Sequence, residues 1–190
     1  MAATLRLLRE RGIAQLTTRE VARCAGVSEA SVFYHYRDRA GLLAAAFAAG
    51  LAPLQALGEE GLAGDDRRAV LRRFGAALER FLDEVLPVLA AAQADPRLRR
   101  ELADFLREHR AGPHRGVDAL SRYLAAEQAA GRARADLDAR VIALSFIGAC
   151  TTRAMQRHMA APAGRLPSLE RLVDGTDALL RPAPSAQRGS

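Results

Sequence analysis

Hydrophobic residues recur every three or four positions along most of the chain, and no segment alternates apolar and polar residues as a half-buried strand would. The abundant residues Ala, Leu, Arg and Glu are good helix formers. The plainest example follows Asp66, where one apolar face is made by Leu71, Phe74, Leu78, Phe81, Val85 and Leu89. The pattern predicts an all-α protein of about nine helices.

Three short helices are predicted at the N-terminus, over residues 2–11, 17–25 and 28–36. Thr17 is a good N-cap, and Glu20 three residues later fits a capping box. Gly26 can take the left-handed conformation that ends a helix, and Ser28 can cap the next one. Two short helices joined by a tight glycine-containing turn form a helix-turn-helix motif.

A fourth helix is predicted to start at Arg39, with Asp38 as its N-cap. Gly41 in its first turn is expected to cost some helix stability. Pro53 is expected to kink or end this helix, because proline has no backbone N–H to donate. The segment 58–66, "GEEGLAGDD", is the predicted joint between two parts of the chain.

Further helices are predicted from Pro96, around Val117–Leu124, through Val141–Cys150, and over Ser168–Leu180. The segment from Val141 to Cys150 is almost continuously apolar, so more than one of its faces must be covered. A second copy of the chain is the economical partner for the outer face. We expect domains at 1–45 and 46–181, followed by a disordered tail at 182–190.

The distribution of charge along the chain is more informative than the net charge. The 190-residue chain has 28 basic residues, all of them Arg, against 22 acidic ones, a formal net charge of +6. Residues 1–43 contain seven Arg and four acids, so half of the excess lies in less than a quarter of the chain. A basic N-terminal region is compatible with a polyanionic partner such as nucleic acid.

Catalytic and metal-binding patterns are missing from the sequence. It has no GxSxG, P-loop, HExxH or Rossmann glycine pattern, so we predict neither an enzyme nor a cofactor. The two cysteines, Cys24 and Cys150, are far apart and are expected to be free thiols, and the scattered histidines do not suggest a metal site. No apolar stretch suits a membrane span or a secretory signal, so a cytoplasmic location is expected.

The stretch "GIAQLTTREVARCAGVSEASVFYHYRDRAGLLAAAF" resembles the DNA-binding domain of the TetR (tetracycline repressor-like) family. The positions that match are Gly12, Thr17, Thr18, Val21, Ala22, Ala25, Gly26, Val27, Ser28, Ser31, Val32, His35, Tyr36, Arg39, Leu42 and Leu43. The resemblance implies a homodimeric transcriptional regulator on a pseudo-palindromic operator of double-stranded DNA, most often a repressor that a small-molecule effector releases. It also implies an effector pocket in the C-terminal domain and dimerisation through the last two helices.

In a helix-turn-helix the second helix enters the major groove. The start of that helix is small, with Ser28, Glu29, Ala30 and Ser31, and can approach base edges closely. Arg19 is the candidate for a bidentate guanine contact, and Glu29 could accept from a cytosine amino group. Contacts to phosphate are expected from Thr17, Thr18, Ser31, Tyr34, His35 and Arg39, although Thr17 would cap its helix with or without DNA.

The sequence allows alternative interpretations of Phe33, of the effector-pocket candidates and of the function. Phe33 stands where the family usually has Tyr, and could either touch a sugar or thymine methyl or belong to the local core. The candidate effector-pocket residues, Phe74, Phe81, Phe105, Tyr123, Thr151 and Met155, could equally be ordinary core. A protein-binding or ligand-binding helical module with a vestigial helix-turn-helix is the main alternative function, and an α-helical enzyme ranks behind it.

Overall fold

The computed structural model describes residues 3–4, 6–7, 16–59, 66–108, 112–159 and 166–182. In this part of the chain the regular structure is helical and contains no strand, which confirms the all-α prediction. The helices are α2 (Thr18–Ala25), α3 (Glu29–Tyr36), α4 (Arg39–Glu59), α5 (Arg67–Ala94), α6 (Pro96–Glu108), α7 (Pro113–Ala129), α8 (Ala139–His158) and α9 (Leu169–Leu180). None of these helices is both long and apolar enough to cross a bilayer.

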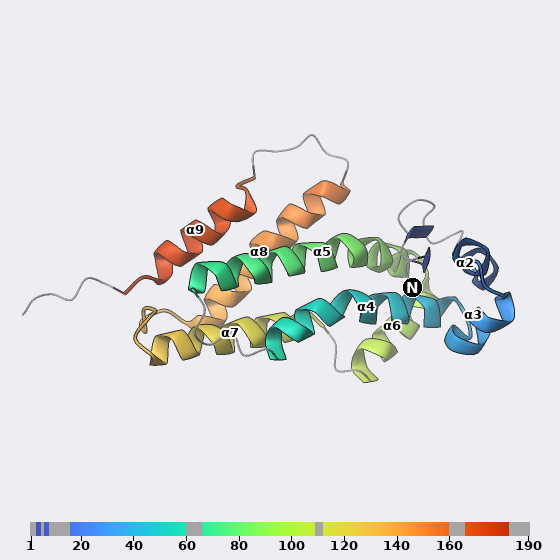
Figure 1. Cartoon of the computed structure of the whole chain (residues 1–190), viewed down its shortest axis with the longest axis horizontal. Helices are drawn as coiled ribbons and strands as arrows, with labels where there is room; N and C mark the ends of the chain where they lie inside the picture. Colours follow the sequence, from blue (N-terminus) through green and yellow to red (C-terminus); the bar gives the residue numbers. More distant parts are fainter. Residues whose placement is uncertain are drawn as a thin grey trace, which may run out of the picture.

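The short helices α2 and α3 lie together at one end of the molecule, and α4 leads away from them toward the other end (Figure 1). The two long helices α4 and α5 pack side by side, and α6 closes against both near the α2–α3 end. α5 also contacts α8 and α9, while α7 packs on α8. The long central helices therefore connect the helix-turn-helix end to the α7–α9 end.

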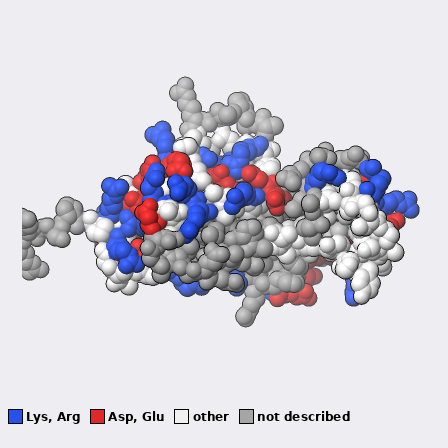
Figure 2. All heavy atoms as spheres, in the orientation of Figure 1, with Lys and Arg blue, Asp and Glu red and all other residues white. Residues whose placement is uncertain are grey.

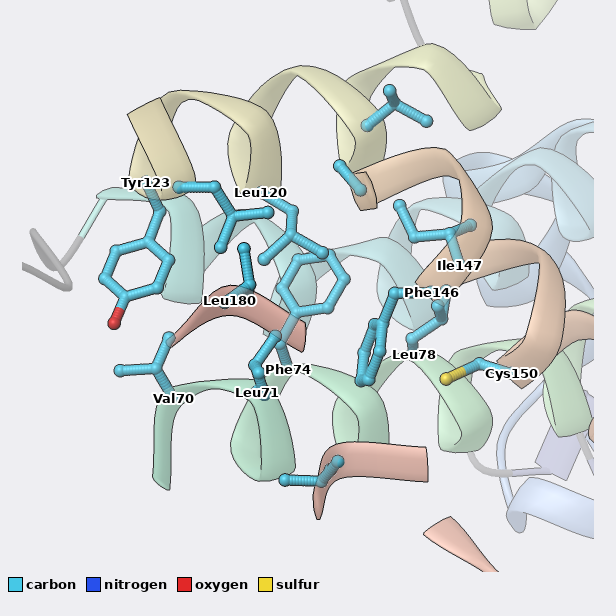
Figure 3. Close-up of a cluster of buried hydrophobic side chains, with 14 of the residues drawn as sticks. Val70, Leu71, Phe74, Leu78, Leu120, Tyr123, Phe146, Ile147, Cys150 and Leu180 are labelled. Carbon is cyan, nitrogen blue, oxygen red and sulfur yellow. The ribbon is translucent and has the colours of Figure 1, made fainter. Parts of the chain in front are cut away.

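Two clusters of buried apolar side chains hold this arrangement together. The larger joins α5, α7, α8 and α9, and its centre contains Phe74, Leu120 and Phe146 (Figure 3). The smaller joins α2, α3 and α4 to the end of α5 and the start of α6, through Leu16, Val21, Val32, Leu42, Leu43, Val88, Ala92 and Leu98. Among the described residues, the helix-turn-helix shares its core with α5 and α6, and α4 runs through the domain boundary expected at residue 45.

The predicted helix caps are confirmed at the helix-turn-helix. The Thr17 hydroxyl accepts the Glu20 N–H at 3.1 Å and starts α2, and Gly26 ends it with φ 68°. The Ser28 hydroxyl accepts the Ser31 N–H at 3.1 Å and starts α3. These bonds satisfy N–H groups that a helix N-terminus leaves without an internal partner. Local sequence chemistry thereby sets the tight α2–α3 turn.

Pro53 does not end α4, and that part of the prediction is wrong. α4 continues to Glu59, six residues beyond the proline, so its lost N–H bond is tolerated. Packing overrides the local preference, because α4 lies along α5 for much of its length. α4 ends at Glu59 and α5 begins at Arg67 with Asp66 as its N-cap, and most of the predicted joint, residues 60–65, lies outside the described residues.

The connection between α3 and α4 is a tight, strained turn. Arg37 has φ 60° and ψ −58°, and the Tyr36 carbonyl accepts the Asp38 N–H at 2.7 Å, which together form a γ-turn. The Asp38 carboxylate then accepts the Gly41 N–H at 3.0 Å and caps α4. A Cβ at Gly41 would lie 1.9 Å from the Tyr36 carbonyl oxygen, so this turn accepts only glycine there. The expected cost to helix stability is therefore outweighed by a steric requirement.

Candidate nucleic-acid interface

The outer face of α3 is exposed along its whole length. Ser28, Glu29, Ala30 and Ser31 at its start are exposed, as the predicted approach to base edges requires. On the opposite side Val32 is buried and Tyr36 is half-buried against the smaller core cluster. One short helix thus has a core side and a solvent side, and the aromatic residues of the motif are divided between them.

Phe33, left undecided by the sequence, lies on the solvent side. Its side chain is 59% exposed and Tyr34 is 83% exposed, while the neighbouring Val32 is buried in the core. Two neighbouring large aromatic residues left in solvent are unusual for a folded protein without a partner. Phe33 is therefore available for an apolar contact with sugar or a thymine methyl, and it does not contribute to the core.

A three-residue cluster links α2 to the start of α3. The Glu29 carboxylate accepts from the Thr18 hydroxyl at 3.1 Å through Oε1 and from Arg19 Nε at 3.4 Å through Oε2. The sequence named all three as DNA contacts but did not predict that they bond to one another. Because a hydroxyl has one hydrogen to donate, Thr18 cannot donate to a phosphate while it donates to Glu29.

The end of α3 carries the other predicted phosphate contacts. His35 is exposed, and its ring meets that of Tyr34 edge-on with centroids 5.3 Å apart. Arg39 is half-buried at the start of α4, and its Nε is buried without a hydrogen-bond partner among the described residues. The exposed Arg37 lies in the turn between them. Arg37 was not among the DNA contacts predicted from the sequence, although its position between His35 and Arg39 was a signal for one.

Charge is distributed unevenly over the surface. Basic side chains border the α2–α3 end with few acidic ones, whereas acidic and basic groups alternate near the α5–α9 end (Figure 2). At the α5–α9 end arginines pair with carboxylates, for example Arg68 with Asp174 at 2.6 Å and Arg157 with Asp83 at 3.0 Å. Arginines of α2 are also paired, Arg23 with Glu20 at 2.9 Å and Arg19 with Glu29 at 3.4 Å, so the exposed Arg37 and the half-buried Arg39 supply the further positive charge beside α3.

The N-terminal residues that form this surface match a known protein family. Residues 1–46 match the family model described as bacterial regulatory proteins, tetR family. Residues 1–46 are therefore a DNA-binding domain of the tetR type. The chain is a DNA-binding transcriptional regulator, and the family whose model it matches is one of regulators rather than enzymes.

Several solved structures share the fold over nearly the whole chain. The TetR family regulator PfmR from Thermus thermophilus is 20% identical, with 93% of each chain covered and a TM-score of 0.59. FadR from Bacillus subtilis, solved with stearoyl-CoA, is 16% identical, covers 95% of each chain and has a TM-score of 0.62. The SmeT–triclosan complex is 18% identical, covers 99% of this chain and 94% of SmeT, and has a TM-score of 0.67. No curated protein sequence matches the chain.

The predicted effector-pocket residues occupy different environments. Phe74 and Tyr123 are buried in the larger core cluster, and Phe81 is partly buried against it (Figure 3). Thr151 is half-buried, and its hydroxyl donates to the Ile147 carbonyl at 2.8 Å. Met155 is 46% exposed. The side chain of Phe105, on α6, lies outside the described residues.

One face of α8 exposes a row of apolar and small residues. Val141 and Leu144 are 56% and 59% exposed, and Met155 and Met159 follow on the same face at helical spacing. Gly148 lies between them, and a Cβ there would meet no atom within 4 Å. Leu179 and Gly175 give α9 a similar open strip. Met155 therefore belongs to this surface rather than to the core around Phe74.

Proposed function

We propose that the chain is a homodimeric repressor, with residues 1–45 binding an operator and residues 46–181 binding an effector and the second subunit. The exposed face of α3 carries this proposal, because Phe33, Tyr34 and His35 project from a helix whose other side is buried. Two copies of α3 would enter successive major grooves of a pseudo-palindromic operator about 34–36 Å apart. Arg19 and Glu29 would read bases, and His35, Tyr34 and Arg39 would contact phosphates.

The exposed face on α8 and α9 supports the dimer. A row of apolar side chains at helical spacing is suited to packing against the same row of a second copy about a two-fold axis. We expect Leu144→Glu to give a monomer in sedimentation velocity at micromolar concentration, because it would place charge in the centre of this face. Ala125→Glu, at an exposed position of α7, is the matched control and should stay dimeric. A dimeric Leu144→Glu would contradict this interface.

An apolar small molecule is the effector class that the interior favours. The larger cluster consists almost entirely of aliphatic and aromatic side chains, most of them from α5, α7 and α8. FadR and SmeT, which share the fold, were solved with stearoyl-CoA and triclosan, both molecules with large apolar parts. The effector would enter between these helices, at the cost of repacking residues such as Phe74 and Phe146.

α4 is the element through which an effector could act on DNA. Phe47 of α4 meets Phe81 of α5 edge-on, with ring centroids 5.6 Å apart. Closer to the helix-turn-helix, Leu43 of α4 packs in one cluster with Val88 of α5 and Leu98 of α6. A ligand that favours a different packing of α5 and α6 would shift α4, and with it the spacing of the two α3 helices.

A DNA-binding assay tests the repressor proposal. Selection from a random duplex pool, followed by fluorescence anisotropy, should yield a palindromic motif whose binding weakens steeply as salt increases. Stearoyl-CoA and triclosan serve as apolar probes, with glucose as a polar control. Release of the duplex by an apolar probe supports the effector proposal. A selected site without two-fold symmetry would contradict the dimeric repressor.

A further inference from the structure

Glu29 is an acidic residue on a surface that must approach a polyanion. It is the first residue of α3, and both carboxylate oxygens are used: Oε1 accepts from Thr18 and Oε2 from Arg19. The Arg19 side chain is nevertheless 82% exposed and that of Glu29 48% exposed. The carboxylate thus bonds to Nε, the nitrogen nearest the Arg19 side-chain stem, and the rest of the guanidinium extends into solvent.

This bond restricts how Arg19 can bind a base. A guanidinium has five N–H donors in a planar fork, and it can form a bidentate contact through Nε and one Nη or through both Nη atoms. With Nε bonded to Glu29, only the edge formed by the two Nη atoms is free. The O6 and N7 atoms of guanine are two adjacent acceptors that fit this edge in the major groove.

The carboxylate also limits what can lie beside that guanine. A carboxylate has no hydrogen to donate at neutral pH, so phosphate oxygens and the acceptors of guanine repel it. The amino group of cytosine is a donor that projects into the major groove, and it is the usual base partner of Glu. A cytosine amino group next to the guanine would complete the coordination of Glu29 without breaking its bond to Arg19.

We infer that Arg19 and Glu29 form one reading unit, in which Glu29 fixes Arg19 for end-on contact with a guanine and itself selects an adjacent cytosine amino group. This inference rests on the proposed operator binding and specifies the sequence class: each half-site contains a guanine and a cytosine in neighbouring major-groove positions. Glu29 therefore lowers affinity for DNA in general and raises the preference for this step.

The test compares full-length wild type with Arg19→Ala, Glu29→Ala, Glu29→Gln and the double Ala variant. Each is subjected to selection from a random duplex pool, and anisotropy then measures binding to the selected duplex and to duplexes changed at the guanine or the cytosine. Asp104→Ala on α6 removes one exposed carboxylate that is paired with Arg107, so it controls for the change in net charge. Thermal melting of each variant establishes that it is folded.

We expect Arg19→Ala to reduce guanine discrimination by about 5- to 150-fold. Glu29→Ala should reduce it by at least several-fold while increasing affinity for unrelated duplexes, and the double variant should lose little more than Arg19→Ala. Glu29→Gln should retain guanine and change the neighbouring preference toward adenine, because a Gln amide pairs with adenine. Asp104→Ala should retain both base preferences.

Two outcomes would overturn this inference alone. The first is a double variant whose loss of guanine discrimination, as a free energy, equals the sum of the losses in the two single variants. This would show that the residues act independently. The second is unchanged guanine discrimination in Glu29→Ala, with tighter binding to every duplex, which would leave Glu29 as a repulsive charge only. Failure of wild type to select any motif would instead overturn the proposed operator binding.

Discussion

Arg67 at the start of α5 and Asp177 of α9 form an ion pair that is nearly excluded from solvent. Arg67 Nη2 lies 2.8 Å from Asp177 Oδ1, and the two side chains are only 11% and 12% exposed. Arg67 also donates to the Arg132 carbonyl and to the main-chain carbonyl of Asp177. One guanidinium therefore joins the first turn of α5, the α7–α8 connection and α9, the helix proposed to lie in the dimer interface.

We expect Asp177→Asn to lower the free energy of unfolding by about 3 kcal/mol, because it leaves a buried guanidinium without its counter-charge. Arg68 and Asp174 join the same two helices at 2.6 Å, but their side chains are 44% and 54% exposed. Asp174→Asn should therefore lower the free energy of unfolding much less than Asp177→Asn does. Urea unfolding at one fixed protein concentration measures both values. Equal effects of the two variants would contradict a structural role for the buried pair.

Tyr123 has a buried hydroxyl without a hydrogen-bond partner among the described residues, and burial raises its pKa to about 12. We expect Tyr123→Phe to raise the free energy of unfolding by about 1 kcal/mol, since it removes an unsatisfied polar group. Tyr36→Phe, at a half-buried position, is the control and should change stability little. A loss of stability in Tyr123→Phe would mean that a partner such as a bound water satisfies the hydroxyl.

The same group gives a stability change at alkaline pH. Between pH 10 and about 12 the unfolded chain loses the Tyr123 proton while the folded chain keeps it, so unfolding releases a proton. The free energy of unfolding should be independent of this group below pH 10 and should fall as pH rises to about 12. Urea titrations at several pH values should show a smaller fall for Tyr123→Phe than for wild type, and identical slopes would contradict the assignment.

The two thiols should differ in reactivity. Cys150 is fully buried, and desolvation raises its pKa to about 12, so its thiol stays protonated and shielded at neutral pH. Cys24 on α2 is only half-buried. An aromatic disulfide reagent should therefore modify one thiol per native chain and two after unfolding. Native Cys24→Ser should not react, and fast modification of that variant would show that Cys150 is accessible.

His35 is expected to contribute affinity without specificity. It is exposed beside Tyr34 near the end of α3, where we propose phosphate contacts, and such contacts carry no direct sequence information. We expect His35→Ala to weaken binding to a selected site and to unrelated duplexes by a similar factor, about tenfold. His114→Ala, at an exposed position of α7, should change neither affinity. A change in base preference with His35→Ala would contradict the phosphate assignment.

Features encoded locally could be predicted from the sequence. Thr17, Ser28 and Gly26 define the ends of α2 and α3 through bonds to neighbours three or four residues away, so short-range patterns suffice. The exposure of Phe33 could not be decided in this way, because it depends on which side of α3 faces the core. Pro53 shows the same limit, since packing of α4 on α5 prevails over the local effect of proline.

Contacts between helices could not be predicted from the sequence either. Arg19 and Glu29 were each assigned to a base, but their mutual bond exists only because the α2–α3 turn brings them together. Likewise, nothing in the spacing of Met155 distinguishes the core side of α8 from its exposed side. Such relations depend on the angle between helices, which caps and periodicity do not determine.

The α3–α4 turn provides a last prediction, at Gly41. Replacing a helical glycine by alanine usually stabilises a protein by about 0.5–1 kcal/mol. At Gly41 the added Cβ would overlap the Tyr36 carbonyl oxygen, 1.9 Å away, in a turn already strained at Arg37. Gly116 in α7 is the matched control, because a Cβ there meets its nearest neighbour, Ile147, at an ordinary 3.5 Å.

We therefore expect Gly41→Ala to lower the melting temperature and weaken binding to every duplex, because a shifted α4 displaces α3 from its position. Gly116→Ala should be neutral or slightly stabilising and should bind DNA as wild type does. Differential scanning calorimetry and anisotropy on a selected duplex measure the two effects. If Gly41→Ala proved as stable as Gly116→Ala, the close approach of α4 to the Tyr36 carbonyl would be wrong, and the sequence-based view of Gly41 as a mere helix-weakening residue would stand.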